Sequence, residues 1–283
     1  MKKNFIKSVV IFCLTAMCWT PANAQDIMLF GDVNQDGSVN IEDVTALINY
    51  LLTDGMPAKT YTVNGVSFNM IPVQGGTFTM GSDYGASYNE RPAHQVSLSR
   101  FSLAETEVTQ ALWQAVMGTN PSYFTGDLNL PVENVSWDDC QEFIAKLNQM
   151  TGKNFRLPTE AEWEFAARGG NLSKDYYYSG SNSSNEVAWC DYNASSQTHP
   201  VASKLPNELG FYDMSGNACE WVQDWFGDYS SEAQTNPTGP TTGTSRVVRG
   251  GSWLYSDIHC RPSDRGHLDP TRKDYNNGLR LAM

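Results

Sequence analysis

Residues 32–43 carry oxygen-bearing side chains at a spacing that suits a hard divalent cation. Gly37 lies in the middle of this stretch, where the chain of a cation-binding loop must turn sharply. Carboxylates, side-chain amides and backbone carbonyls are the donors that Ca²⁺ prefers. We therefore predict a calcium loop. Its ligands would be Asp32, Asn34, Asp36, Ser38 (through its carbonyl oxygen) and Asp43.

One amphipathic helix is predicted after this loop, at 41–52, and none before it. With Asp43 as the last ligand, the loop and helix at 25–56 resemble the dockerin repeat of secreted glycan-degrading assemblies. The resemblance covers a single repeat, whereas a dockerin has two. Two interpretations stay open: the repeat packs on the main domain as a calcium-stiffened spacer, or it binds a cohesin-like partner.

The first residues combine lysines with an apolar run that ends in Ala22-Asn23-Ala24. This order is typical of a secretory signal peptide, which we predict at 1–24. A lipid anchor on Cys18 is the less favoured alternative, because the residues before it fit a lipobox poorly. We expect a protein that is secreted to the periplasm or the cell surface, with no transmembrane segment.

The chain is acidic, with 31 Asp and Glu against 19 Lys and Arg and a formal net charge of −12. This charge argues against nucleic acid and anionic membranes as partners. Its 283 residues suffice for one large domain and a small appendage. We assign 57–67 to a linker and the start of a hairpin, and 68–283 to the main domain.

Local signals predict three elements of the main domain. Asn64-Gly65 lies between two alternating runs, which predicts a hairpin turn. Ser136 can cap a helix over 137–150, and Thr159 begins a capping box for a helix over 160–169. Short helices in a chain rich in Gly, Asn, Ser and aromatic residues predict an irregular α+β domain with much loop surface.

Several long motifs run through the main domain and resemble those of the formylglycine-generating (sulfatase-modifying factor) family. The resemblance implies a C-type-lectin-like fold in which the terminal strands pair, so that 68–73 lies close to 279–281. The motifs are Glu105-Thr106-Glu107-Val108-Thr109, Pro131-Val132-Glu133-Asn134-Val135-Ser136-Trp137, Arg156-Leu157-Pro158-Thr159-Glu160-Ala161-Glu162-Trp163-Glu164, and Arg246-Val247-Val248-Arg249-Gly250-Gly251-Ser252-Trp253.

Active members of that family hold copper(I) with two cysteines and oxidise a sulfatase cysteine with molecular oxygen. Aligning Gly250-Gly251-Ser252 puts the second cysteine on Cys260 and the first on Tyr255. A phenol is a poor substitute for a thiolate on a soft metal. The resemblance implies Cys260 and Ser252 as catalytic residues only if the chain is an active oxidase, with Cu⁺ as its cofactor.

The stretch 213–221 resembles the family's calcium turn. By that resemblance Asp213 and Glu220 supply carboxylates, while Gly216 and Ala218 supply backbone carbonyls, which suits Ca²⁺. A hydrogen-bonded turn without metal is the alternative. Cys219 stands where the family often has a tryptophan on the active-site floor. By that resemblance it faces Cys260, as a displaced thiol pair or as a disulfide; two unpaired buried thiols are the alternative.

Two functions from different classes remain. The favoured one is a non-catalytic binding or accessory protein, because one copper ligand is missing, and its ligand would be a protein, a peptide or a glycan. The alternative is a copper-dependent oxidase that converts a sulfatase cysteine to formylglycine. For the binding function, a run that resembles the ligand-display loops of variable proteins with this fold supplies the contacts: Trp253, Leu254, Tyr255, Asp257 and His259.

Overall fold

The computed structural model describes residues 57–84 and 87–283. Within them, the first element is a hairpin of β1 (Lys59–Val63) and β2 (Val66–Val73). The turn residues Asn64 and Gly65 have positive φ values, 47° and 84°, as a two-residue turn between twisted strands requires. The predicted hairpin is confirmed.

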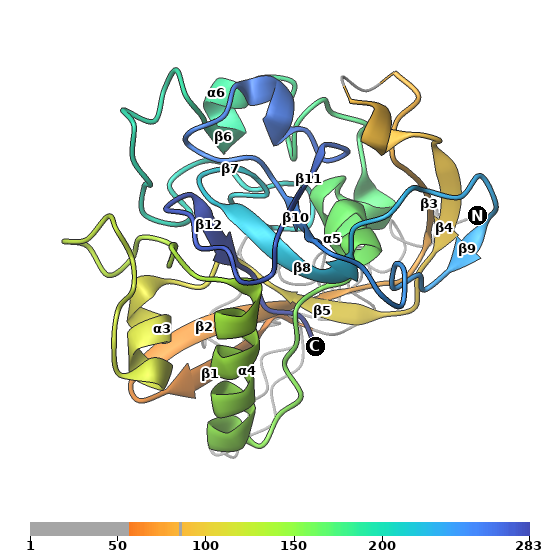
Figure 1. Cartoon of the computed structure of the whole chain (residues 1–283). Helices are drawn as coiled ribbons and strands as arrows, with labels where there is room; N and C mark the ends of the chain where they lie inside the picture. Colours follow the sequence, from red (N-terminus) through yellow and green to blue (C-terminus); the bar gives the residue numbers. More distant parts are fainter. Residues whose placement is uncertain (1–56, 85–86) are drawn as a thin grey trace, which may run out of the picture. The chain divides into compact units, whose positions relative to one another are not determined.

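A four-stranded sheet runs through the middle of the domain (Figure 1). Its order is β11 (Arg265–Leu268), β10 (Arg246–Arg249), β8 (Cys219–Trp225) and β12 (Asn277–Leu279). The first three strands are antiparallel neighbours, whereas β12 runs parallel to β8. The smaller sheets pair β2 with β5 (Phe101–Ala104), β3 (Thr77–Met80) with β4 (His94–Ser97) and β9 (Gln234–Thr235), and β6 (Ala188–Trp189) with β7 (Ser215–Gly216).

Both predicted helices are present, and the predicted α+β class is confirmed. Ser136 accepts a hydrogen bond from the Asp139 backbone N–H at the start of α4, and Thr159 caps α5 in the same way. The end of α5 lies earlier than predicted, at Ala167 rather than Gly169. The helices are α3 (Gln110–Met117), α4 (Trp137–Thr151), α5 (Glu160–Ala167) and α6 (Ser184–Val187), with 3₁₀ turns η1 (Tyr88–Glu90), η2 (Gly170–Leu172) and η3 (Asp257–Cys260).

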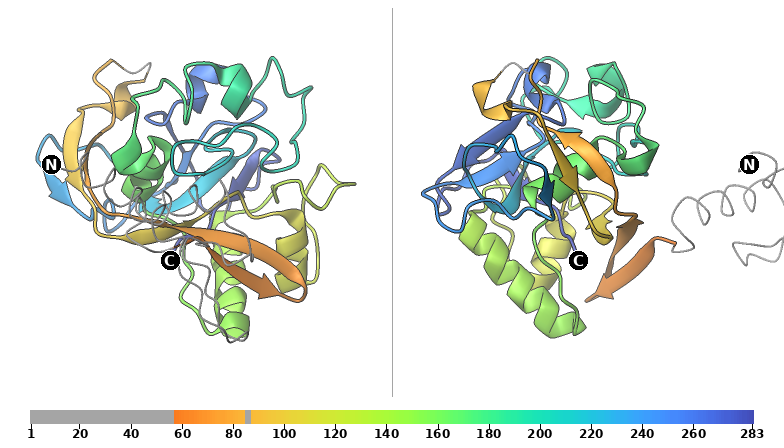
Figure 2. Two further views of the ribbon diagram at one scale, coloured as in Figure 1. Left: turned by 180° about the vertical axis from the view of Figure 1, so that it is seen from behind. Right: turned by 90° about the vertical axis from the view of Figure 1, so that its right-hand side faces the viewer.

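α3 is an element that the sequence did not predict; it packs between the β1–β2 hairpin and α4 (Figure 2). Its limits have local signals in the sequence. Thr109 accepts a hydrogen bond from the Leu112 backbone N–H, and Gly118 ends the helix with φ of 81°.

The C-terminal segment lies one strand away from its predicted neighbour. β12 pairs with β8, and the residues after it hydrogen-bond to β5: Ala104 N donates to Leu281 O at 2.8 Å, and Ser102 N to Met283 O at 3.0 Å. Since β5 pairs with β2, it separates the C-terminus from 68–73. The segments 68–73 and 279–281 therefore lie in the same region, as expected, but they do not pair with each other, because β5 lies between them.

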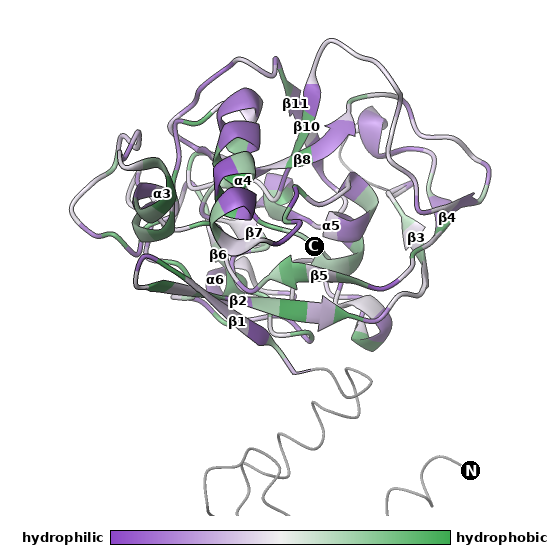
Figure 3. Ribbon diagram, turned by 90° about the horizontal axis from the view of Figure 1, so that it is seen from below, coloured by the Kyte–Doolittle hydropathy of each residue, from purple (hydrophilic) through white to green (hydrophobic). Residues whose placement is uncertain are grey.

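Apolar side chains from both helices and sheets form two main buried clusters. One gathers α3 and α4 with β8 and the C-terminal strand, and the other lies around α5, β3 and β5. Hydrophobic residues are frequent along β2 and β5 (Figure 3), and Met70, Ile71, Val73, Phe101 and Leu103 of these strands are buried. Cys140 is completely buried on α4, in one cluster with Phe143, Ile144 and Leu147.

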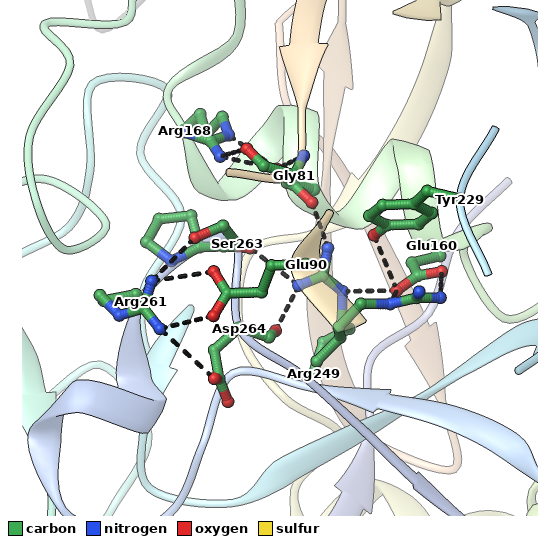
Figure 4. A network of polar contacts seen from close by, with 12 residues as sticks. Gly81, Glu90, Glu160, Arg168, Tyr229, Arg249, Arg261, Ser263 and Asp264 are labelled. Carbon is green, nitrogen blue, oxygen red and sulfur yellow. Dashed lines mark hydrogen bonds and ion pairs between the residues drawn. The ribbon is translucent and has the colours of Figure 1, made fainter. Parts of the chain in front are cut away.

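Buried arginines join α5 to the strands that carry the candidate site (Figure 4). Arg249 on β10 forms ion pairs with Glu160 and Glu164 of α5. Arg265 on β11 also binds Glu160, at 2.7 Å, and Arg261 binds Glu90 at 2.8 Å. Because each of these charges is paired inside the domain, the loop between β10 and β11 is fixed to the core.

Candidate functional site

The chain leaves β10 through two glycines and folds back on η3. Gly250 and Gly251 have φ values of 95° and 69°. A Cβ atom on Gly251 would lie 2.6 Å from the carbonyl oxygen of His259 and 2.9 Å from Sγ of Cys260. Only glycine permits this approach, so the turn packs directly on Cys260.

A cavity of about 260 Å³ lies next to this turn. Cys219 and Tyr255 both contribute to its lining. Cys260 does not: its side chain is 0% exposed and packs in an apolar cluster that also contains Cys190 and Tyr178. Cys260 therefore lies behind the cavity wall, next to Gly251, and Cys219 is among the neighbours that raise its pKa. Other lining residues include Ser87, Val248, His259, Asp264, His267 and Asn277.

The described cysteines are all free thiols, so a Cys219–Cys260 disulfide is not formed in this structure. Burial raises the pKa of Cys219 to about 12, although a hydrogen bond with Ser252 opposes the shift. Burial, followed by the neighbouring Cys190, raises the pKa of Cys260 well above its usual value. Both thiols are protonated at neutral pH.

These donors do not fit a copper(I) centre of the kind the resemblance implies. Copper(I) favours two thiolates, but the cavity offers Cys219 beside the phenol of Tyr255. The thiol of Cys260 lies outside the cavity lining. Ser252 is also buried, and its hydroxyl accepts a hydrogen bond from Asn276 at 3.1 Å.

Aromatic side chains gather beside this cavity. Trp253 is buried and contacts Tyr275 with ring centroids 5.7 Å apart, and Tyr275 contacts Tyr123 at the same distance. The Tyr255 hydroxyl hydrogen-bonds to Asn276. Tyr123, Tyr255 and Tyr275, with the adjacent Leu254, form a surface that we call the aromatic rim. All four side chains are exposed, from 42% to 70% of their surface.

Two of the predicted ligand-binding residues are exposed on the rim, and the other three are buried or have side-chain partners within the domain. Leu254 and Tyr255 are exposed as expected, whereas Trp253 supports the rim from below. Asp257 accepts a hydrogen bond from Ser184 at 3.0 Å, and His259 lies 3.4 Å from Asp264. Tyr123 and Tyr275 were missed, because they come from segments remote from 252–260 and no local pattern marks them.

In the stretch resembling the calcium turn, both predicted carboxylates are buried but they have different partners. Glu220 is bound by the Arg280 guanidinium at 2.7 Å and by Trp163 Nε1 at 2.6 Å. Asp213 accepts a hydrogen bond from Ala202 N on Oδ2, while its Oδ1 is buried and has no hydrogen-bond partner. Gly216 is in the left-handed conformation, with φ of 82°, and its N–H donates to Gly250 O.

Glu107 is a functional candidate that the sequence did not assign. Its carboxylate accepts hydrogen bonds from Ala218 N at 2.9 Å and from Asn217 Nδ2 at 2.7 Å. Burial, then Asp213 and Glu220, raise the pKa of Glu107 well above its usual value, and burial raises that of Asp213 to about 6.

Three buried carboxylates thus share one guanidinium, that of Arg280. The excess of carboxylates over cations and the unpartnered Oδ1 of Asp213 suit a hard cation. Glu220 is less available as a ligand, because it already binds Arg280. Within residues 57–84 and 87–283, no three His, Cys, Asp or Glu side chains are spaced to hold a metal. Calcium at this turn, with Gly216 and Ala218 as carbonyl ligands, stays a prediction.

The N-terminal calcium loop lies outside the described residues. Its predicted ligands Asp32, Asn34, Asp36, Ser38 and Asp43, like the signal peptide, fall within 1–56. None of the helices in the described part of the chain combines the length and apolarity needed to cross a membrane.

Comparisons with known proteins match both parts of the chain. The sulfatase-modifying factor enzyme 1-like domain matches residues 59–283, and the dockerin type I domain matches residues 30–65.

Similar proteins differ in their names. The chaperone protein LppX of Paenibacillus barcinonensis is 34% identical, covering 77% of this chain and 90% of its own. The formylglycine-generating enzyme of Streptomyces coelicolor is 31% identical, covering 75% and 88%. The solved structure of Treponema denticola variable protein 1 has a TM-score of 0.75 and 36% identity, covering 80% and 99%. The chain therefore belongs to the sulfatase-modifying factor enzyme 1-like domain family, with the α+β, C-type-lectin-like fold of that family.

Proposed function

We propose that this chain is a non-catalytic family member that binds a protein, peptide or glycan ligand at the aromatic rim. One observation carries the proposal: the cavity is lined by Tyr255, which stands at the position of the first cysteine, and Cys260 is buried behind Gly251. Exposed aromatic side chains on a rigid frame make large contact areas at a small cost in conformational entropy. The relative named as a chaperone is consistent with a binding role.

The alternative function is a copper-dependent oxidase that acts on a sulfatase cysteine, and one observation favours it. Cys219 lines the same cavity as Tyr255 and is hydrogen-bonded by Ser252. A relative at 31% identity is named a formylglycine-generating enzyme. The oxidase function needs a second soft donor beside Cys219; Cys260 is the candidate, since Cys219 is among the neighbours that raise its pKa, but it does not line the cavity.

Copper(I) titration separates the two functions. We expect the purified chain to show no stoichiometric tight copper(I) binding and to leave the thiol of a Cys-x-Pro-x-Arg peptide intact in oxygen, as followed by mass spectrometry. The Streptomyces coelicolor enzyme serves as the positive control. Tight binding that disappears in both Cys219→Ser and Cys260→Ser, together with loss of the peptide thiol, would establish the oxidase function instead.

Ligand binding at the rim is tested first by a glycan array and by pull-down from the native secretome. For any ligand found, Tyr275→Ala and Tyr255→Ala should each weaken binding by about tenfold or more, because exposed aromatics at the centre of an interface act as hot spots. Tyr84→Ala is the matched control, since Tyr84 is fully exposed and contributes to neither the rim nor its cavity. Equal losses in all three variants would contradict the proposed site.

We also propose that Asp213, with the backbone carbonyls of Gly216 and Ala218, binds Ca²⁺ in the main domain. When the free calcium concentration is about 100 times the Kd, calcium should stabilise the domain by about 3 kcal/mol. This stabilisation raises the Tm by about 5 °C or more. Calorimetry with calcium or EDTA measures this shift. Asp213→Asn should abolish most of it, whereas Asp43→Ala, in the N-terminal loop, should leave the transition of the main domain unchanged; the opposite pattern would refute the site.

For the N-terminal repeat we propose that this chain is secreted and that the repeat binds a cohesin-like partner in a calcium-dependent way. The match of residues 30–65 to a dockerin type I domain supports this role. A pull-down with cohesin modules in calcium and in EDTA tests it, with Asp36→Ala as the variant that removes a predicted ligand. Capture that is insensitive to both EDTA and Asp36→Ala would contradict it.

A further inference from the structure

A second cavity, of about 500 Å³, lies away from the aromatic rim. Its walls come from the first residues of α5, from β3 and β4, and from the loop 227–240. Arg265 is the only residue that it shares with the Tyr255 cavity. Neither the proposed ligand binding nor the calcium turn makes use of it.

A buried carboxylate faces this cavity with one oxygen unused. Asp224 is 4% exposed and lines the cavity. Its Oδ2 accepts a hydrogen bond from Glu160 N at 2.9 Å, at the start of α5, but no described residue donates to Oδ1. Burial, then the charge of Glu160, raise the pKa of Asp224 to about 7, and the more weakly acting Arg265, which is bound to Glu160, opposes the shift.

A buried histidine adds a second unused acceptor. His94 is 5% exposed and lines the cavity. Its Nδ1 lies 3.0 Å from the carbonyl oxygen of Pro92, so Nδ1 donates to this oxygen, and in the neutral ring Nε2 is an acceptor. No described residue hydrogen-bonds to Nε2. Asp228 also lines the cavity, and its carboxylate has no hydrogen-bond partner in the described part of the chain.

The charged donors of the cavity are already committed. Arg265 binds both carboxylate oxygens of Glu160 at 2.7 and 2.8 Å and the backbone carbonyls of Asn89 and Gly227 at 3.0 Å. The Tyr229 hydroxyl donates to Glu160 at 3.2 Å. The groups left for a ligand are therefore acceptors, with serine and threonine hydroxyls between them.

We propose that this cavity binds the ammonium or guanidinium group of a small alkyl amine or of a basic side chain, held by Asp224 and Asp228. A cation with several N–H donors satisfies these acceptors together. Trp225, Tyr229 and Pro237 line the cavity and can cover an alkyl stem. A bound metal suits it less, because no three metal-ligating side chains in the described residues are suitably spaced.

Isothermal titration calorimetry on the full chain at physiological salt tests this proposal. The probes are agmatine and putrescine for free amines, Nα-acetyl-arginine amide for a side chain, and 1,4-butanediol as the uncharged control. We expect saturable binding of at least one cation and none of butanediol. Asp224→Asn should weaken binding about tenfold or more, because it removes one charge-assisted contact while keeping an oxygen for Glu160 N.

Two further variants make the result decisive. Asp228→Asn lies in a loop and should weaken binding without affecting the fold, which guards against a failure of Asp224→Asn to fold. Asp269→Asn, at a residue that is not part of the cavity lining, removes the same charge and should leave the affinity unchanged. The proposal is overturned if no cation binds, if butanediol binds equally well, or if Asp269→Asn weakens binding as much as the cavity variants.

Discussion

Replacing Arg280 by methionine should lower the free energy of unfolding by about 3–5 kcal/mol, because it leaves a buried carboxylate without its cation. Arg280 is completely buried and binds Glu220 at 2.7 Å. It also donates to the carbonyl oxygens of Ala104 at 2.9 Å and Tyr212 at 2.8 Å, so it joins β8 to β5 and to a loop. Chemical denaturation at neutral pH measures the loss.

A double variant identifies the cause of that loss. Glu220→Gln removes the charge but keeps an oxygen that can accept from Trp163, so Glu220→Gln with Arg280→Met should recover part of the stability. Arg272→Met is the control, since Arg272 forms an exposed pair with Asp274 and should show no measurable change. If the double variant is no more stable than Arg280→Met, lost packing rather than the unpaired charge accounts for the effect.

Local elements of this fold could be predicted because their determinants are close together in the sequence. Asn64-Gly65 specifies its own turn, and Ser136 and Thr159 cap helices within their first turn. The pairing of β12 with β8, and the insertion of β5 between β2 and the C-terminus, depend on contacts between distant segments. No local pattern encodes such contacts, which is why the C-terminus was placed one strand too close to β2.

The same limit applies to the site. The sequence identified Tyr255 at the position of a missing thiolate, because the glycines before it fix the alignment. It could not show that Cys260 packs with Cys190 behind Gly251, since Cys190 lies in a distant segment. Nor could it show that Arg280 binds Glu220, a predicted calcium ligand, because a ligand list read from one turn omits side chains that arrive from elsewhere.

Replacing Glu133 by glutamine should remove one defined part of the pH dependence of stability, to which Glu107, Asp213 and Asp224 also contribute. Glu133 is completely buried, its Oε1 accepts from Phe124 N at 2.8 Å, and its Oε2 has no hydrogen-bond partner. Burial raises its pKa to about 7, and only the backbone N–H groups of Phe124 and Tyr123 oppose the shift. The folded state therefore binds this proton more tightly than the unfolded state between pH 4.5 and about 7.

The sign of the effect follows from this shift. The stability supplied by protonated Glu133 is complete below its usual pKa of 4.5 and is lost as the pH rises to about 7. The shift corresponds to about 3 kcal/mol. In Glu133→Gln this loss should be absent, so the variant gains on the wild type as the pH rises, whereas the exposed control Glu142→Gln should follow the wild-type curve.

Denaturation midpoints across this pH range test the prediction, and binding at the aromatic rim gives a second readout. Glu133 holds the backbone of Tyr123 and Phe124, and Phe124 packs on Trp253 with ring centroids 5.3 Å apart. These backbone hydrogen bonds favour the ionised form of Glu133, so its ionisation should leave the segment that presents Tyr123 in place, and rim affinity should not fall with this midpoint. Parallel curves of stability against pH for the wild type and the variant would contradict the prediction. They would show that Glu133 is ionised in the folded protein and that its Oε2 accepts from a donor that the described residues do not supply.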